Sequence, residues 1–285
     1  EGFFMSTATN PAGPWEPLHQ IWGVTGWDDC CPFWDDDGQG YLITTNYAGK
    51  YKIHLFKMSD DGKQIIMGSD SVIHQSKGSE ANKLYKINGT YYHYYSEVKA
   101  EGRVPMMGRS KNIYGPYQSK QLFHVNKQKD KEPNQGGLIQ LESGGWWFFT
   151  HQGTGSWEGR AACLLPVTWI NDVPVIGSVG ADTIGNMVWT YKKPVSKSSV
   201  IFPQSNDEFN SGKLAVQWEW NYQPRKEKWS LTDRKGFLRL HAFVPVKLKD
   251  TKDKRPLLYR AGTTLTLRSM RTKKSEVSIK INISK

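Results

Sequence analysis

The stretch Asp37-Gly38-Gln39-Gly40-Tyr41-Leu42-Ile43 is a glycine turn that leads into an apolar strand, and the same pattern occurs twice more. The lead glycines Gly38, Gly89 and Gly144 stand roughly fifty residues apart. Each turn is followed by β-branched and aromatic residues without helical spacing, which predicts a hairpin. A repeat of this period indicates propeller blades or a solenoid, and hairpins favour a β-propeller. The other two copies are Asn88-Gly89-Thr90-Tyr91-Tyr92-His93-Tyr94-Tyr95 and Ser143-Gly144-Gly145-Trp146-Trp147-Phe148-Phe149.

A second pattern repeats with the first. Asn10-Pro11-Ala12-Gly13-Pro14-Trp15 returns two periods later as Asn112-Ile113-Tyr114-Gly115-Pro116-Tyr117. A propeller arranges its blades around one axis, so residues that are distant in sequence meet there. We therefore expect functional residues near the starts of the blade strands.

Composition restricts the class of protein. The chain has 285 residues with 13% aromatic residues, and it has no apolar run long enough to span a membrane. The residues that follow Glu1 do not have the pattern of a signal peptide. The net charge of +11 is spread along the sequence, which favours a solvated basic surface over nucleic-acid binding. Cys30, Cys31 and Cys163 form no disulfide framework and are too few for a zinc site.

The repeat of glycine turns and aromatic residues ends near Tyr191, which predicts two domains. We expect a propeller over residues 1–195, a linker rich in Ser, Lys and Pro over residues 196–206, and a second β domain over residues 207–285. The tryptophans of this second part and the alternating run from Phe237 to Phe243 predict a β-sandwich. A last strand-like run, Val277 to Ile283, has no closing partner in the sequence.

Acidic residues near the strand starts are the candidates for chemistry. Asp35, Asp36 and Asp37 precede a turn glycine and are expected to bind local backbone amides. Asp28 and Asp29 begin an apolar strand, where an unpaired carboxylate is costly, so one of them is a candidate site residue.

Spacing relates Asp29 to a second acid. Asp29 lies nine residues before Gly38, and Glu80 lies nine before Gly89. Equal spacing predicts that the two carboxylates occupy equivalent blade positions and face one axial cavity. A surface position for Glu80 stays open on spacing alone.

Several motifs in the right order resemble glycoside hydrolase family 43. They are the sequences around Asp29 and Glu80, Pro133-Asn134-Gln135-Gly136-Gly137, Gly159-Arg160 and Pro166-Val167-Thr168-Trp169. Residues from Asp207 to Leu231 resemble the accessory β-sandwich of the β-xylosidase and α-L-arabinofuranosidase branch. The resemblance implies an all-β protein, a five-bladed β-propeller followed by a partial β-sandwich.

The resemblance also implies roles for the two acids. Glu80 matches the general acid that protonates the leaving glycosidic oxygen, and Asp29 matches the aspartate that orients this acid and tunes its pKa. A neighbouring carboxylate raises the pKa of an acid because it disfavours a second negative charge. Such enzymes resemble the inverting class, in which water fits between base and sugar.

Other residues are implied as sugar contacts. Arg160 matches an arginine that enters the sugar pocket, with a surface ion pair as the alternative. Gln135 stands where many relatives carry a histidine, which leaves open whether Gln135, Asn134 or His151 takes that place, as a sugar contact or as support for a calcium ion on the axis. Trp22 and Trp27 are candidates for stacking on a pentose, with inter-blade packing as the alternative.

The general base of the family, in an Asp-Pro-Ser motif of the first blade, has no match here. We therefore expect that the chain is cut at both ends and that this piece is itself poorly active, since general-base help is worth about 100- to 10,000-fold. A non-catalytic carbohydrate-binding propeller is the alternative. The expected partners are xylan, arabinoxylan or arabinan oligosaccharides, with no nucleic acid, no membrane and no required cofactor. The substrate class implies a secreted or periplasmic protein.

Overall fold

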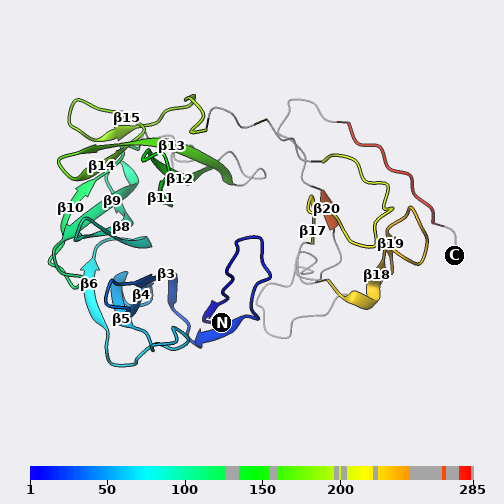
Figure 1. Ribbon diagram of the computed structural model, residues 1–285, viewed down its shortest axis with the longest axis horizontal. Coiled ribbons are helices and arrows are strands. Elements are labelled where there is room, and N and C mark those ends of the chain that lie inside the picture. Colours follow the sequence, from blue (N-terminus) through cyan, green and yellow to red (C-terminus); the bar gives the residue numbers. More distant parts are fainter. Residues whose placement is uncertain are drawn as a thin grey trace. The chain divides into compact units, whose positions relative to one another are not determined.

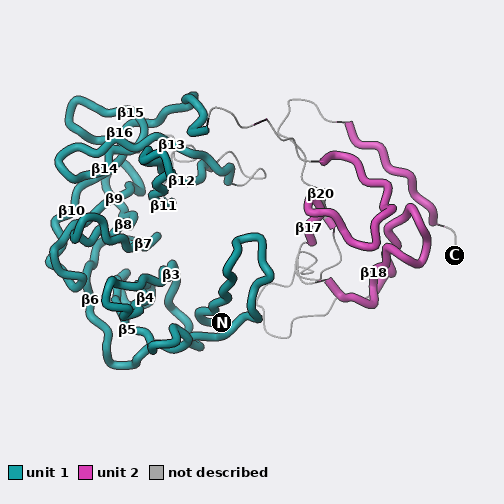
Figure 2. Tube along the Cα trace, viewed as in Figure 1, with its two compact units in different colours: residues 1–196 teal, residues 197–285 magenta. Residues whose placement is uncertain are grey.

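Figure 1 shows the computed structural model, which describes residues 1–125, 135–153, 160–195, 199, 204–220, 224–243, 265–267 and 276–283. The chain forms two compact units, residues 1–196 and residues 197–285 (Figure 2). The boundaries at 195, 206 and 207 stay a prediction, because residues 196–198 and 200–203 lie outside the described part.

The first unit contains three four-stranded antiparallel sheets that follow one another along the chain (Figure 1). In each sheet the strands are paired in sequence order. The first is β3 (Trp27–Trp34), β4 (Gly40–Asn46), β5 (Lys52–Lys57) and β6 (Ser71–Gln75); the second is β7 (Glu80–Ile87), β8 (Thr90–Lys99), β9 (Gly102–Ser110) and β10 (Gln118–Gln121); the third is β11 (Gly136–Gln140), β12 (Trp146–Gly153), β13 (Arg160–Ile170) and β14 (Val173–Ile176).

Two smaller sheets accompany them, β1 (Phe3–Met5) with β2 (His19–Trp22), and β15 (Ser178–Val179) with β16 (Gly185–Asn186). Four-stranded antiparallel sheets from successive stretches are the blades of the predicted propeller. Among the described residues only three such blades are present, so the count of five blades stays a prediction.

The aromatic run of β8 lies in a blade that packs on both faces. In β8, Tyr91 and Tyr95 belong to the core shared with the first blade, whereas Tyr92 and Tyr94 belong to the core shared with the third. Successive residues of a strand point to opposite faces, so a strand buried on both sides must be apolar throughout. This requirement explains the aromatic run after Gly89, whereas Phe149 in the run after Gly144 is exposed.

The turn glycines have the backbone that the pattern requires. Gly38, Gly89 and Gly144 have φ values of 86°, 67° and 86°, a region that favours glycine. The second repeat is also a structural repeat: the N–H groups of Gly13 and Gly115 donate to the carbonyl oxygens of Asn10 (2.8 Å) and Asn112 (2.9 Å). Both sequence patterns therefore encode turns between strands.

The second unit has only short strands in its described part. β17 (Trp218–Trp220) pairs with β20 (Leu265–Leu267), and β18 (Trp229–Ser230), which follows the 3-10 helix η1 (Lys226–Lys228), pairs with β19 (Arg239–Leu240). The strand predicted over Phe237–Phe243 is therefore confined to two residues. The strand predicted over Val277–Ile283 is wrong: these residues are not a strand in the described part of the chain, and their apolar side chains are exposed.

No helix among the described residues is long and apolar enough to cross a membrane.

Candidate active site

The site is built on two irregular strand starts. The pairing of β3 with β4 shifts between Asp28 and Cys31, and the pairing of β7 with β8 shifts between Glu80 and Lys83. Within these shifts Asp29 and Ala81 adopt left-handed backbone, with φ values of 47° and 69°. An inserted residue of this kind bends a strand and redirects side chains, and it is common beside active sites.

The pairing corrects the predicted equivalence of Asp29 and Glu80. Asp28 pairs with Thr45 before its shift, just as Glu80 pairs with Ser96 before its own, so Asp28 is the counterpart of Glu80. Counting back from the turn glycines fails because the two hairpin loops differ in length, residues 35–39 in the first blade and residues 88–89 in the second.

The Asp29 carboxylate nevertheless reaches the second blade. Its Oδ2 accepts hydrogen bonds from the backbone N–H of Ala81 (2.8 Å) and from Nε2 of Gln135 (3.1 Å). Ala81 directly follows Glu80, and Gln135 directly precedes β11. Asp29 therefore joins the starts of all three blades, and Gln135, one of the predicted site residues, is brought to it.

A buried polar network holds this junction. Asn82 is fully buried, and its Nδ2 donates to the Asp29 carbonyl (3.2 Å) and to Oγ1 of Thr45 (2.8 Å). The Asn82 Oδ1 lies 3.0 Å from Nε2 of His93, which must then be the donor. Burial, and after it the proximity of His74, lowers the pKa of His93 to about 3, so the imidazole is neutral.

Glu80 is the half-buried first residue of β7. Its Oε1 forms an ion pair with Nη1 of Arg103 at 3.0 Å. Burial raises the pKa of Glu80; Arg103 opposes the rise, and the Asp29 and Asp28 carboxylates add to it. The raised pKa suits a proton donor, although burial contributes more than the neighbouring aspartate that the sequence singled out.

The hydrogen bonds and ion pairs of the described residues do not connect Arg160 or His151 with Glu80 or Asp29. Arg160 is exposed at the start of β13. His151 is half-buried in β12, and burial, with a smaller contribution from Arg160, lowers its pKa. Asn134 lies outside the described residues. The roles of Arg160 and His151 stay predictions.

Trp22 and Trp27 lie side by side in a cluster of aromatic rings. Their ring centroids are 5.1 Å apart, and Trp22 also contacts Phe3 (6.0 Å) and Phe56 (5.5 Å). Both tryptophans pack against the core between β1–β2 and the first blade. This arrangement favours the packing alternative, and their stacking on a sugar stays a prediction.

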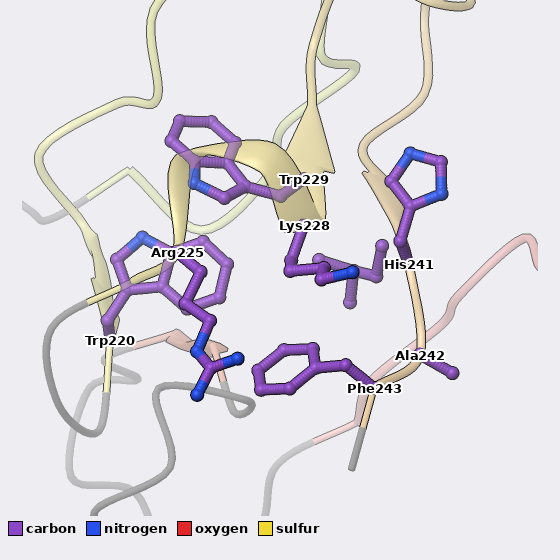
Figure 3. A pocket seen from close by; sticks show the side chains of 8 residues that line it. Trp220, Arg225, Lys228, Trp229, His241, Ala242 and Phe243 are labelled. Carbon is purple, nitrogen blue, oxygen red and sulfur yellow. The ribbon is translucent and has the colours of Figure 1, made fainter. Parts of the chain in front are cut away.

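A cavity of about 280 Å³ in the second unit offers different chemistry (Figure 3). Aromatic and basic side chains line it, among them Trp220, Arg225, Trp229 and Phe243, and Arg225 lies over the Phe243 ring at 4.6 Å. None of its lining residues is acidic. The described residues that line this cavity therefore offer no carboxyl group for acid–base chemistry, whereas the strand starts of the first unit have three.

The described residues contain no group of three or more His, Cys, Asp or Glu side chains that could hold a metal ion. The calcium ion on the axis stays a prediction to which we assign no step.

Sequence reasoning missed Arg103 and the support from Asn82 and His93. Arg103 could have been found from the β8–β9 hairpin, because pairing through its turn places Arg103 opposite Val98, two residues beyond Ser96. Ser96 in turn pairs with Glu80.

Comparisons with known families match both parts of the chain. The model described as "Glycosyl hydrolases family 43" matches residues 1–174, and "Beta xylosidase C-terminal Concanavalin A-like domain" matches residues 206–280. The second match identifies residues 206–280 with a β-sandwich domain despite the short strands described there.

Curated relatives cover most of the chain. A β-xylosidase of Formosa agariphila is 36% identical over 272 residues, 85% of this chain and 46% of the relative. A non-reducing end α-L-arabinofuranosidase of Bacteroides ovatus is 31% identical over 258 residues, 84% of this chain and 46% of the relative. The chain thus spans about half the length of the curated relatives that it matches.

The fold of this chain is also similar to solved structures of GH43 proteins. A bifunctional GH43-CE protein of Bacteroides eggerthii superimposes with a TM-score of 0.71 at 27% identity, covering 94% of this chain and 33% of that one. The GH43 BlXynB protein of Bacillus licheniformis superimposes with a TM-score of 0.69 at 26% identity, covering 83% of this chain and 47% of that one.

Proposed function

This chain belongs to glycosyl hydrolase family 43, and from that premise we propose that it acts as a glycosidase on terminal xylosyl or arabinofuranosyl residues. The substrates are oligosaccharides from xylan, arabinoxylan or arabinan, in keeping with the activities for which its relatives are named. The proposal depends most on one observation: the Asp29 carboxylate is hydrogen-bonded to the residue that follows Glu80.

In the proposed reaction Glu80 is the general acid. It holds its proton because it is half-buried near two other carboxylates, and it delivers the proton to the leaving glycosidic oxygen as the bond to the sugar breaks. Asp29 is a positioning residue that orients the start of β7 through Ala81. A water molecule attacks from the opposite face of the sugar, which inverts the anomeric configuration. We assign no residue of this chain as the general base.

The experiment is an assay of the full-length protein on β-xylosides and α-L-arabinofuranosides, with the product followed by proton NMR. Inversion predicts that the sugar first appears as the anomer opposite to the substrate bond and then equilibrates. Release of the retained anomer would contradict the inverting mechanism. Binding of these oligosaccharides without turnover would favour a carbohydrate-binding propeller instead.

We also propose that the protein works outside the cytoplasm, because its polymeric substrates are found there. Cell fractionation tests this proposal, and recovery of the full-length protein from the cytoplasm alone would overturn it.

A further inference from the structure

Arg103 makes three contacts with the strand starts of the second blade. Its Nη1 lies 2.6 Å from the carbonyl oxygen of Gly78, 3.2 Å from Oγ of Ser96 and 3.0 Å from Oε1 of Glu80. Glu80 and Ser96 are paired neighbours on β7 and β8, and Arg103 comes from β9. One guanidinium therefore connects three strands at the point where Glu80 begins β7.

The backbone leaves room for this guanidinium. Gly78 has a φ of 67°, and a Cβ at this position would lie 3.0 Å from Cγ2 of Val98 and 3.3 Å from Nη2 of Arg103. A larger residue would therefore press on the arginine as well as strain the turn. Gly78 is itself buried, so Arg103 satisfies a carbonyl that water does not reach.

The two carboxyl oxygens of Glu80 have different surroundings. Oε1 faces the cation, whereas Oε2 makes no hydrogen bond or ion pair with any described residue. A hydrogen on Oε1 would face the guanidinium nitrogen Nη1, which is positively charged and has no lone pair to accept it. A proton on Glu80 therefore belongs on Oε2.

We propose that Arg103 is the positioning residue of the general acid: it holds Oε1 of Glu80 so that Oε2 carries the proton that is transferred. This role rests on the proposed function of Glu80. The guanidinium also stabilises the carboxylate that forms as the proton leaves, because the ion pair reaches full strength only then. Burial favours the protonated form of Glu80, whereas Arg103 favours the carboxylate. Arg103 therefore makes it easier for Glu80 to release its proton.

The test compares Arg103→Gln, which keeps hydrogen-bond donors but removes the charge, with Arg103→Lys, which keeps the charge. Removing the charge raises the pKa of Glu80, so the limb at which kcat/KM falls with rising pH moves upward, by about one pH unit or more. Arg103→Lys moves this limb less. Both variants lose kcat, by up to about 100-fold, because the carboxyl group is less well oriented.

Arg109→Gln is the matched control. Arg109 lies on the same strand, and its Nη1 also donates to a backbone carbonyl, that of Asn171, at 3.0 Å. In this variant, kcat/KM should fall with rising pH over the same pH range as in the unmodified protein. If Arg103→Gln lowers the melting temperature but also leaves the limb in place, Arg103 has a structural role only and the proposal is wrong.

A second readout does not need turnover. Selective ¹³C labelling of glutamate carboxyl groups follows the titration of Glu80, whose signal is assigned by its absence in Glu80→Gln. We expect Glu80 to titrate at higher pH in Arg103→Gln than in the unmodified protein. The shift without any pentosidase activity would overturn the proposed function and retain the ion-pair effect, whereas no shift would overturn the role of Arg103. If Arg103→Gln does not fold, Glu80 is titrated in Arg103→Lys and in the Arg109→Gln control. Because lysine keeps the charge, a Glu80 pKa close to that in the control supports the charge effect. A large rise of the Glu80 pKa in Arg103→Lys contradicts it.

Discussion

The start of β3 and the start of β7 have the same irregular backbone conformation but carry different side chains. Both shift their pairing by an inserted residue, and both place that residue in left-handed backbone. In β3 this residue is Asp29, which carries a carboxylate; in β7 it is Ala81, which offers only its N–H. The carboxylate of one bulge binds the N–H of the other, so the repeat provides both halves of a contact between blades.

The difference shows how a repeated blade becomes an asymmetric site. The acids that precede the two bulges, Asp28 and Glu80, are counterparts, but Asp28 is exposed and Glu80 is half-buried and paired with Arg103. Burial raises the pKa of both carboxyl groups, but only Glu80 forms an ion pair with a cation. Burial and charge around the position, rather than the fold, decide which acid suits catalysis.

Among changes to the two inserted residues, the largest effect should come from removing the charge of Asp29. Asp29→Asn weakens the contact with Ala81 and removes a negative charge near Glu80, which lowers the pKa of Glu80. The pH limb at which kcat/KM falls with rising pH should move to lower pH, and kcat/KM should fall about 100-fold. Asp28→Asn is the control, with a smaller shift and little loss. Equal losses in the two variants would contradict the distinction between these neighbouring aspartates.

A bulkier residue at the second bulge should reduce stability. Ala81 is buried at φ 69°, where a β-branched side chain is strongly disfavoured. We expect Ala81→Val to lower the free energy of unfolding by about 2–3 kcal/mol, measured by urea denaturation. Ala162→Val, at an exposed strand position, should have little effect. An unchanged stability for Ala81→Val would mean that the left-handed bulge is absent.

A pH-dependent effect on stability concerns His93, which supports the junction through its contact with Asn82. Its pKa is about 3 in the folded protein and about 6.5 when unfolded, so the unfolded state binds an extra proton between these values. Stability should therefore fall as pH drops through this window, by at most about 1.4 kcal/mol per pH unit. His93→Gln should flatten this part of the dependence, as measured by denaturation at several pH values. His19→Gln, at an exposed position, should leave it unchanged.

The sequence was sufficient for features that depend on local chemistry. Turn glycines such as Gly89 and the aromatic runs behind them predicted the hairpins. Motifs predicted Asp29 and Gln135, which the structure brings into contact.

Features that depend on register could not be predicted in this way. The inserted residues and unequal loops shift the count between Asp29 and Glu80, and no spacing rule shows this shift. Pairing through the β8–β9 turn could have placed Arg103 near Ser96, but its ion pair with Glu80 also depends on the shifted register of β7 with β8. The exposed run at Val277–Ile283 shows the converse, since an apolar pattern alone does not provide a partner strand.

The central claim is that Glu80 donates the proton to the leaving group. The most direct measurement compares Glu80→Gln in the full-length protein on pentosides with poor and with good leaving groups, since only the former need a proton. We predict a loss of about 100- to 10,000-fold in kcat with alkyl or natural leaving groups and a small change with a dinitrophenolate leaving group. Glu97→Gln, at a half-buried position on β8, should affect both substrates little. Equal losses on both substrates in Glu80→Gln would contradict the account.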